Sequence, residues 1–167
     1  MYPPRKKANT DNNTNNDLPP TGARLRGLAF ALLGRREWSK QALHDKLLQS
    51  GADHAEVAEL IEEFVEKDYQ NDSRTAQTAV RANLRKGRGP ARIKQDLKSR
   101  ELDPNLATDT LAETDWLAMA VALRVKKFGE ALPTDQKEKA RQLRFLQYRG
   151  FDGQTCQKAL RWTDDAD

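Results

Sequence analysis

The sequence has little of what covalent, metal or redox chemistry requires. Its 167 residues include one cysteine, Cys156, which excludes an internal disulfide and favours a reducing, cytoplasmic setting. The two histidines, His44 and His54, stand in no grouping with cysteine or carboxylate that has metal-ligand spacing. No histidine lies near Cys156 in the sequence, so nucleophilic catalysis has no support. We therefore expect no enzymatic activity, no metal and no cofactor, with Cys156 in a core.

The chain also lacks long apolar runs and strand-like alternation. No run of about 18 apolar residues is present, so no segment is expected to span a bilayer. The basic residues Arg5, Lys6 and Lys7 are not followed by an apolar stretch, which argues against a secretory signal. No segment of useful length alternates apolar and polar residues with the period of a β-strand. These absences predict an all-α protein of the cytoplasm.

What the chain has in quantity is charge. Charged residues make up 32% and hydrophobic residues 37% of the sequence, a balance that suits a helical protein with thin cores. The formal net charge is +4 and the isoelectric point is about 9.2. Because a basic surface attracts acidic partners, nucleic acid is the first expectation, and an anionic membrane surface is the alternative.

Composition and periodicity divide the chain into tails and modules. Residues 1–21 are rich in asparagine and proline, which predicts a disordered tail, and residues 163–167 form an acidic tail. Between them, apolar residues recur with the period of a helix, and glycines and capping residues interrupt the pattern. This pattern predicts three three-helix modules, over residues 22–70, 71–113 and 114–162.

The modules look like repeats of one another. Leu43 and Leu47 correspond to Ile93 and Leu97 at an offset of 50 residues. Each module alone is too small for a robust core, so we expect helix-turn-helix-like repeats stacked end to end in an elongated, curved rod.

Particular residues mark the expected helix boundaries. N-caps are predicted at Ser39 and at Asp53, and a cap cluster at Asn71-Asp72-Ser73, where polar side chains precede an apolar-periodic segment. A short helix is expected from Asp103, and a last helix is expected over residues 154–162.

The strongest local signal is the stretch from Asp72 to Leu102. It holds nine positive and three negative residues, and its net charge of +6 exceeds the +4 of the whole chain. Arginines at positions 74, 81, 85 and 88 are spaced to lie along one side of a helix and its exit. A glycine corner at residues 87–89 then brings a second basic helix close to them. Such a local excess of charge predicts a site for phosphates or another acidic partner.

Two further interpretations are less favoured, one of the glycine turn in this stretch and one of the aromatic residues elsewhere in the chain. The Gly87-x-Gly89 turn lacks the Gly-Lys-Ser/Thr end of a P-loop and follows no strand, so we interpret it as a helix-breaking corner. Aromatic side chains stack on unpaired bases in some proteins, but here we expect them to pack between modules; these residues are Trp38, Trp116, Trp162, Tyr69 and Tyr148.

Several of these stretches resemble the signatures of one known family. Two of them belong to the middle module, Asn71-Asp72-Ser73-Arg74 and Lys86-Gly87-Arg88-Gly89-Pro90-Ala91-Arg92-Ile93 with Leu97. They are similar to the central signature of the RecX regulatory proteins. The first and third modules contribute Trp38-Ser39 with Leu43 and Leu47, and Phe145-Leu146-Gln147-Tyr148-Arg149-Gly150-Phe151. The resemblance covers roughly residues 24–162 and leaves the N-terminal tail outside.

The resemblance implies both a fold and a function. RecX proteins are built of three tandem three-helix repeats and act as small cytoplasmic modulators of the RecA recombinase. They lie in the groove of the filament that RecA forms on single-stranded DNA, and most inhibit its ATP hydrolysis and strand exchange. They also bind DNA directly. We therefore expect a monomer whose partners are the RecA filament and single- and double-stranded DNA.

The charge pattern supplies the candidate binding residues. A second, weaker basic stripe is expected on the third module, where acidic neighbours dilute it. The predicted DNA- and filament-binding residues are Arg74, Arg81, Arg85, Lys86, Arg88, Arg92, Lys94, Lys98, Lys137, Arg141, Arg144 and Arg149.

One alternative function follows from the same helices. Three-helix modules with a glycine-containing turn also describe transcription regulators that read DNA with a recognition helix. The candidate residues are arginines and lysines with few asparagines or glutamines on the same faces, which favours contact with the DNA backbone over base reading.

Overall fold

The structure, a computed structural model, describes residues 18–163, and every regular element in that range is a helix. The first module contains α1 (Gly22–Leu33), α2 (Lys40–Leu48) and α3 (His54–Glu66). The second contains α4 (Asp72–Arg85), α5 (Pro90–Ser99), the 3-10 helix η1 (Pro104–Ala107) and α6 (Thr108–Glu113). The third contains α7 (Trp116–Phe128), α8 (Gln136–Tyr148) and α9 (Gly153–Ala159). The predicted all-α fold of tandem three-helix repeats is confirmed.

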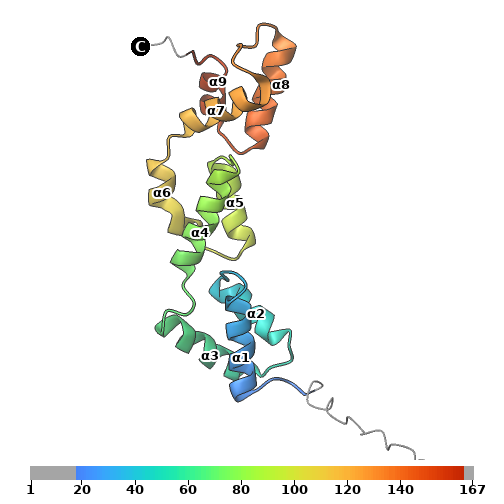
Figure 1. Ribbon diagram of the computed structural model, residues 1–167, viewed down its shortest axis with the longest axis vertical. Coiled ribbons are helices and arrows are strands. Elements are labelled where there is room, and N and C mark those ends of the chain that lie inside the picture. Colours follow the sequence, from blue (N-terminus) through green and yellow to red (C-terminus); the bar gives the residue numbers. More distant parts are fainter. Residues whose placement is uncertain (1–17, 164–167) are drawn as a thin grey trace, which may run out of the picture.

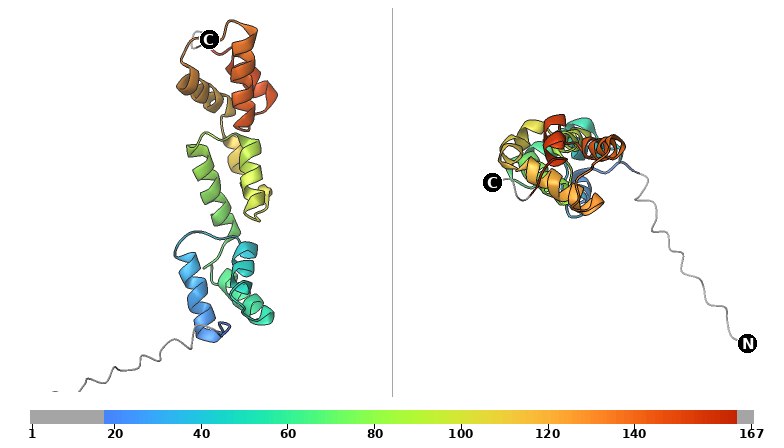
Figure 2. Two further views of the ribbon diagram at one scale, coloured as in Figure 1. Left: turned by 90° about the vertical axis from the view of Figure 1, so that its right-hand side faces the viewer. Right: turned by 90° about the horizontal axis from the view of Figure 1, so that it is seen from above.

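The three groups of helices follow one another along the long axis of the molecule. Figure 1 shows α1–α3 at one end, α4–α6 in the middle and α7–α9 at the other end. In the views of Figure 2 the groups remain separate along this axis and overlap when seen from its end, so the molecule is elongated. Most of the two predicted tails, residues 1–17 and 164–167, lies outside the described residues. None of the described helices combines the length and the apolarity needed to cross a bilayer.

Side chains close the first turns of the helices as the sequence predicts. Ser39 Oγ accepts a hydrogen bond from the backbone N–H of Ala42 at 3.1 Å, and Asp53 Oδ1 accepts one from that of Ala55 at 2.9 Å. The side chain of Asn71 caps α4 in the same way. Each cap satisfies a backbone donor that the helix itself leaves unpaired. The N-caps predicted at Ser39 and Asp53 are confirmed, and within the predicted cluster Asn71-Asp72-Ser73 the capping residue is Asn71.

Each group of helices buries its own small core. Leu43, Leu47 and Phe64 are buried in the first core, and Ile93 and Leu97 in the second. The third core contains the buried residues Ala120, Leu146, Phe151, Cys156, Ala159 and Leu160. The expected place of Cys156 in a core is confirmed, and burial raises the pKa of its thiol to about 11.

The second and third cores are not independent, because Trp116 packs against both. The indole Nε1 of Trp116 donates to the carbonyl oxygen of Leu111 at 2.9 Å, and its ring meets Phe151 edge-on at 6.4 Å. A side chain at the first position of α7 therefore joins two modules.

Two helix boundaries differ from those expected. The helix predicted from Asp103 is split into η1, which Asp103 caps, and α6, because Ala107 at their boundary leaves the helical conformation with φ −108° and ψ 3°. The last helix ends at Ala159 rather than at Trp162.

A buried arginine holds the connection between α7 and α8. Arg124 on α7 is 1% exposed, and its guanidinium donates to the carbonyl oxygens of Ala131 at 3.3 Å and Glu130 at 3.5 Å. No sequence pattern indicates this role, because arginine in an amphipathic helix ordinarily marks the solvent face.

Glu63, on the acidic face of α3, should make the stability of the fold depend on pH. Glu63 accepts hydrogen bonds from Arg26 and Lys67, and these lower the pKa of its carboxyl from 4.5 to about 2. A carboxyl whose pKa is lower in the folded state stabilises the fold above its unfolded pKa and loses that effect as pH falls toward the folded pKa. The melting temperature of the wild type should therefore fall more between pH 4.5 and about 2 than that of Glu63→Gln.

Glu59→Gln is the matched control, because Glu59 lies exposed on the same helix and has no ion pair among the described residues. It should follow the wild-type pH profile. Parallel profiles for the wild type and Glu63→Gln would contradict the prediction.

Candidate nucleic-acid interface

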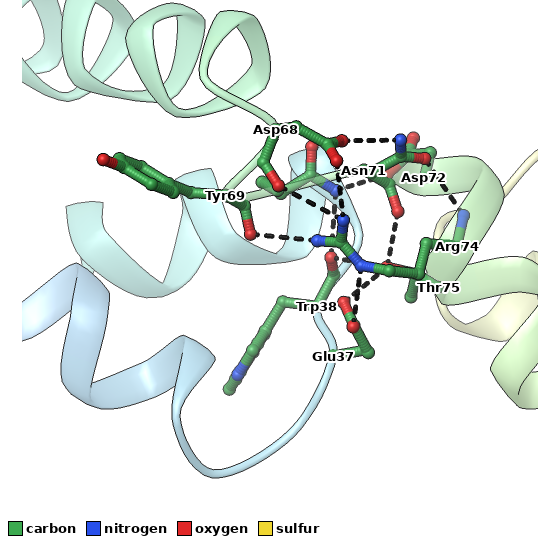
Figure 3. A network of polar contacts seen from close by, with 9 residues as sticks. Glu37, Trp38, Asp68, Tyr69, Asn71, Asp72, Arg74 and Thr75 are labelled. Carbon is green, nitrogen blue, oxygen red and sulfur yellow. Dashed lines mark hydrogen bonds and ion pairs between the residues drawn. The ribbon is translucent and has the colours of Figure 1, made fainter.

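Arg74, one of the predicted binding residues, lies in the junction between the first and second modules. Figure 3 shows its guanidinium pointing toward the segment that links the modules. It donates to Glu37 Oε1 at 2.9 Å, to the carbonyl oxygen of Asp68 at 3.2 Å and to that of Tyr69 at 3.1 Å. Arg74 therefore fixes α4 to the first module, and its proposed contact with DNA would have to compete with these bonds.

Other side chains complete this junction. Gln70, which is 2% exposed, donates through Nε2 to the carbonyl oxygen of Trp38 at 3.0 Å and to Asp72 Oδ1 at 2.8 Å. The same Asp72 oxygen accepts from the backbone N–H of Lys40 at 2.8 Å. Thr75 Oγ1 also donates to Trp38 O at 3.2 Å. The first junction is thus a network of side chains, visible in Figure 3.

The junction between the second and third modules is made by the backbone. The N–H of Gly89 donates to the carbonyl oxygen of Arg149 at 2.8 Å, and the N–H of Ala91 donates to that of Gly150 at 3.1 Å. Side chains are excluded at this contact: a Cβ on Gly89 would lie 2.4 Å from the carbonyl carbon of Gly150. Gly150 itself has φ +99°, a conformation that favours glycine, and a Cβ there would lie 2.6 Å from Arg92 Cγ.

Three predicted cations of this region also bind the protein itself. Arg149 donates through Nε to the carbonyl oxygen of Gly87 at 3.3 Å and through Nη2 to that of Lys86. Arg92 Nε donates to the carbonyl oxygen of Tyr148 at 2.8 Å. Arg88 donates to Asn83 Oδ1 at 2.9 Å.

Asp96 lies close to Arg88 and partly neutralises its charge. Its carboxylate accepts from the buried Asn83 Nδ2 at 2.8 Å and from Arg100 Nε at 2.8 Å, and Arg88 Nη1 lies 3.9 Å from it. Partial burial raises the pKa of Asp96, but hydrogen bonds from Asn83 and Arg100 and the charges of Arg100 and Arg88 outweigh it and lower the pKa overall. Arg88 is therefore partly neutralised, whereas sequence spacing had grouped it with free cations.

The remaining candidates face solvent. Arg141 pairs with Glu138 at 3.2 Å and lies over the Phe128 ring. Within residues 18–163, seven candidates are exposed and have no ion pair or side-chain hydrogen bond: Arg81, Arg85, Lys86, Lys94, Lys98, Lys137 and Arg144.

A groove across the second junction collects two of these cations and adds two that the sequence analysis missed. Arg85 and Lys86, at the end of α4, line it together with Lys126 and Lys127 from the last turn of α7. Its volume is about 570 Å³, and its other lining residues are Leu84, Gly87, Met119, Ala122, Leu123, Phe145 and Arg149. No carboxylate is among the described residues that line it. The groove therefore presents positive charge around an apolar floor.

The sequence contained no signal that placed the two lysines here. Lys126 and Lys127 form a basic pair next to Phe128-Gly129. Such a pair is ordinary at the C-terminus of a helix, because the helix dipole favours positive side chains there. Only the contact between modules sets them beside Arg85 and Lys86.

The other exposed candidates lie apart from this groove. Lys94 and Lys98 line a separate hollow formed by α5, η1 and α6, which also includes Asp103. Lys137 and Arg144 line neither that hollow nor the groove. The twelve predicted residues thus do not all belong to the groove.

Comparison with known proteins decides the family. The sequence pattern of the second three-helix domain of RecX matches residues 71–111, and that of the third matches residues 113–160. The regulatory protein RecX of Acinetobacter baylyi is 50% identical over 140 residues, which cover 84% of this chain and 88% of that protein. This chain belongs to the RecX family. The RecX of Acidithiobacillus ferrooxidans is 39% identical over 133 residues, covering 80% of this chain and 86% of that protein.

Solved structures of RecX proteins share the fold. The crystal structure of RecX from Lactobacillus salivarius matches with a TM-score of 0.73 at 20% identity and covers 83% of this chain and 94% of that one. A second RecX crystal structure matches with a TM-score of 0.69 at 15% identity and covers 84% of this chain and 73% of that one.

The stretches that carry the RecX resemblance meet one another in space. The segment 86–93 and the segment 145–151 are the two sides of the backbone contact between Gly89 and Gly150. Trp38-Ser39 and the segment 71–74 are likewise parts of the first junction. The RecX signatures in this chain are thus largely the parts by which the modules are joined.

The close contact at Gly89 generates a stability prediction. Gly89→Ala forces backbone apart at the second junction and weakens two backbone hydrogen bonds, so it should lower the free energy of unfolding by about 1–3 kcal/mol. Urea denaturation measures the change. Gly153→Ala is the control, because a Cβ at Gly153 meets nothing within 4 Å, and its stability should be unchanged or higher. Equal stability of the two variants would contradict the proposed packing.

Proposed function

We propose that this protein is a monomeric, cytoplasmic regulator that binds the RecA filament on single-stranded DNA, binds DNA directly, and inhibits the ATP hydrolysis and strand exchange of RecA. Membership of the RecX family supports the regulatory role and suggests the recombinase. The observation that carries the DNA contact is the groove in which Arg85, Lys86, Lys126 and Lys127 converge without a carboxylate.

The chemistry of the groove suits phosphates rather than base edges. Lysine and arginine neutralise backbone phosphates. Asparagine and glutamine, which read base edges, are absent from the described residues that line the groove. Binding through such a groove is independent of sequence. This property fits a partner that covers whatever single strand the recombinase occupies.

The elongated shape supports a contact with more than one recombinase protomer. The modules follow one another along one axis, and backbone bonds tie the second to the third. A stiff element laid along neighbouring protomers restrains their relative motion. We infer that this restraint slows ATP turnover and strand exchange, which require the protomers to move.

The direct test follows ATP hydrolysis by RecA assembled on single-stranded DNA. Addition of this protein at one molecule per protomer or less should lower the hydrolysis rate, because the bound rod restrains the filament. An unchanged rate at stoichiometric protein would refute the modulator role. A preference for one duplex sequence by about 10³-fold or more would instead indicate a transcription regulator.

A pair of charge variants tests the DNA contact. Arg85→Ala/Lys86→Ala should lower the affinity for single-stranded DNA and reduce the slope of log affinity against log salt by about 1.4, since each lost phosphate contact contributes roughly 0.7. Both side chains are exposed and unpaired in the described structure, so stability should not change. Binding measured at several salt concentrations gives the slope.

The matched control is Arg35→Ala/Lys158→Ala, which removes one arginine and one lysine that are exposed outside the groove. Its salt slope should equal that of the wild type. Equal slopes for all three proteins would show that the groove does not hold the DNA.

A further inference from the structure

A second hollow lies at the same junction and shares only Arg149 with the lining of the basic groove. Its volume is about 340 Å³, and it is lined by Arg88, Arg92, Gln95, Asp96, Ser99, Tyr148 and Arg149. This volume lies at the small end of the range of ligand pockets, which is roughly 300–1,000 Å³. The hollow therefore suits a single ring system better than an extended segment.

Tyr148 is the unusual member of this hollow. It ends α8 and is 72% exposed, the largest fraction among the exposed large hydrophobic residues of the described chain. From the sequence, Tyr148 is expected to pack between modules, as Trp38 and Trp116 do against their cores. That expectation is wrong for most of the Tyr148 ring. An aromatic ring exposed to water does not gain the stabilisation that burial gives, so the exposure of Tyr148 favours a role in binding over a role in folding.

The orientation of the ring is nevertheless fixed. The guanidinium carbon of Arg92 lies 4.5 Å from the ring centroid, over one face. Arg92 is itself held by the carbonyl oxygen of Tyr148 at 2.8 Å and by Gln95 Oε1 at 3.3 Å. A cation–π contact on one face and high exposure leave the opposite face accessible to a flat ligand.

The chemistry of the lining identifies that ligand. Arg88, Arg92 and Arg149 outnumber the one carboxylate, Asp96, so an anionic ligand is favoured. No aliphatic side chain lines the hollow among the described residues, and an apolar peptide anchor would therefore find only the tyrosine ring to pack on. A nucleobase with its phosphate supplies both a π face and a negative charge.

We propose that Tyr148, backed by Arg92, is a stacking platform for one unpaired base of single-stranded DNA. This inference rests on the DNA-binding part of the proposed function and adds to it a means of telling single strands from duplex. Bases within a duplex are already stacked and cannot offer a face to the ring, whereas an unpaired base can. The basic groove on the same junction would then hold phosphates of the same strand.

The test compares Tyr148→Ala with Tyr148→Phe in binding to a short fluorescent oligo(dT). Loss of one stacked base should weaken the binding of Tyr148→Ala by about 5- to 150-fold, and Tyr148→Phe, which keeps the π face, should bind like the wild type. The salt slope of Tyr148→Ala should not change, because no charge is removed. Affinity for a duplex of the same length should also be unchanged.

Two controls separate stacking from indirect effects. Trp162→Ala removes another exposed aromatic residue of the third module, one that does not line the hollow, and should bind oligo(dT) like the wild type. An abasic oligonucleotide has phosphates without bases, so the wild type and Tyr148→Ala should bind it equally. Thermal unfolding of Tyr148→Ala should match that of the wild type closely, given the exposure of the ring.

Four outcomes would overturn the inference. Equal affinity of the wild type and Tyr148→Ala for oligo(dT) removes it while leaving the proposed DNA binding intact. A loss of equal size on the abasic strand shows that Tyr148 acts only by placing Arg92, and a loss seen only with the RecA filament shows that the ring contacts protein. If the wild type itself does not bind oligo(dT), the DNA-binding part of the proposed function fails, and this inference fails with it.

Discussion

The backbone contact between Gly89 and Gly150 is the constraint on which the functional surface depends. Two segments far apart in sequence approach so closely that neither position has room for a Cβ, and two backbone hydrogen bonds hold them there. The contact sets the end of α4 beside the end of α7, which forms the basic groove. It also sets Arg92 of the second module over Tyr148 of the third. Both candidate sites therefore belong to the junction rather than to either module alone.

Several arginines of the basic surface bind the protein itself, whereas other arginines and most of the nearby lysines face solvent. Arg74, Arg92 and Arg149 donate to backbone carbonyl oxygens at the junctions, which their several donors in a planar group can reach at once. Most of the lysines that line the groove and the α5 hollow have no protein partner among the described residues. A count of positive charges thus overstates the charge available to an acidic partner, because part of it is already neutralised or shared within the fold.

The two junctions are built differently, and the difference bears on how a rod could follow a filament. At the first, side chains such as Gln70, Asp72 and Arg74 connect the modules, so their relative orientation depends on several torsion angles. At the second, backbone bonds and a shared Trp116 fix the orientation more directly. The stretches that carry the RecX resemblance lie at these junctions.

The sequence by itself determined the helices, their caps and the tandem repeat, because apolar periodicity and capping are local properties of the chain. It identified Ser39 and Asp53 as caps, a cap cluster at Asn71-Asp72-Ser73, and the second module as the most basic. Only the tertiary structure decided which cations are free, since Arg74, Arg88 and Arg149 find partners that are distant in sequence or across a turn. It also placed Lys126 and Lys127 in the groove and left Tyr148 exposed. Periodicity reports which face of one helix is apolar, whereas these positions depend on how one module meets the next.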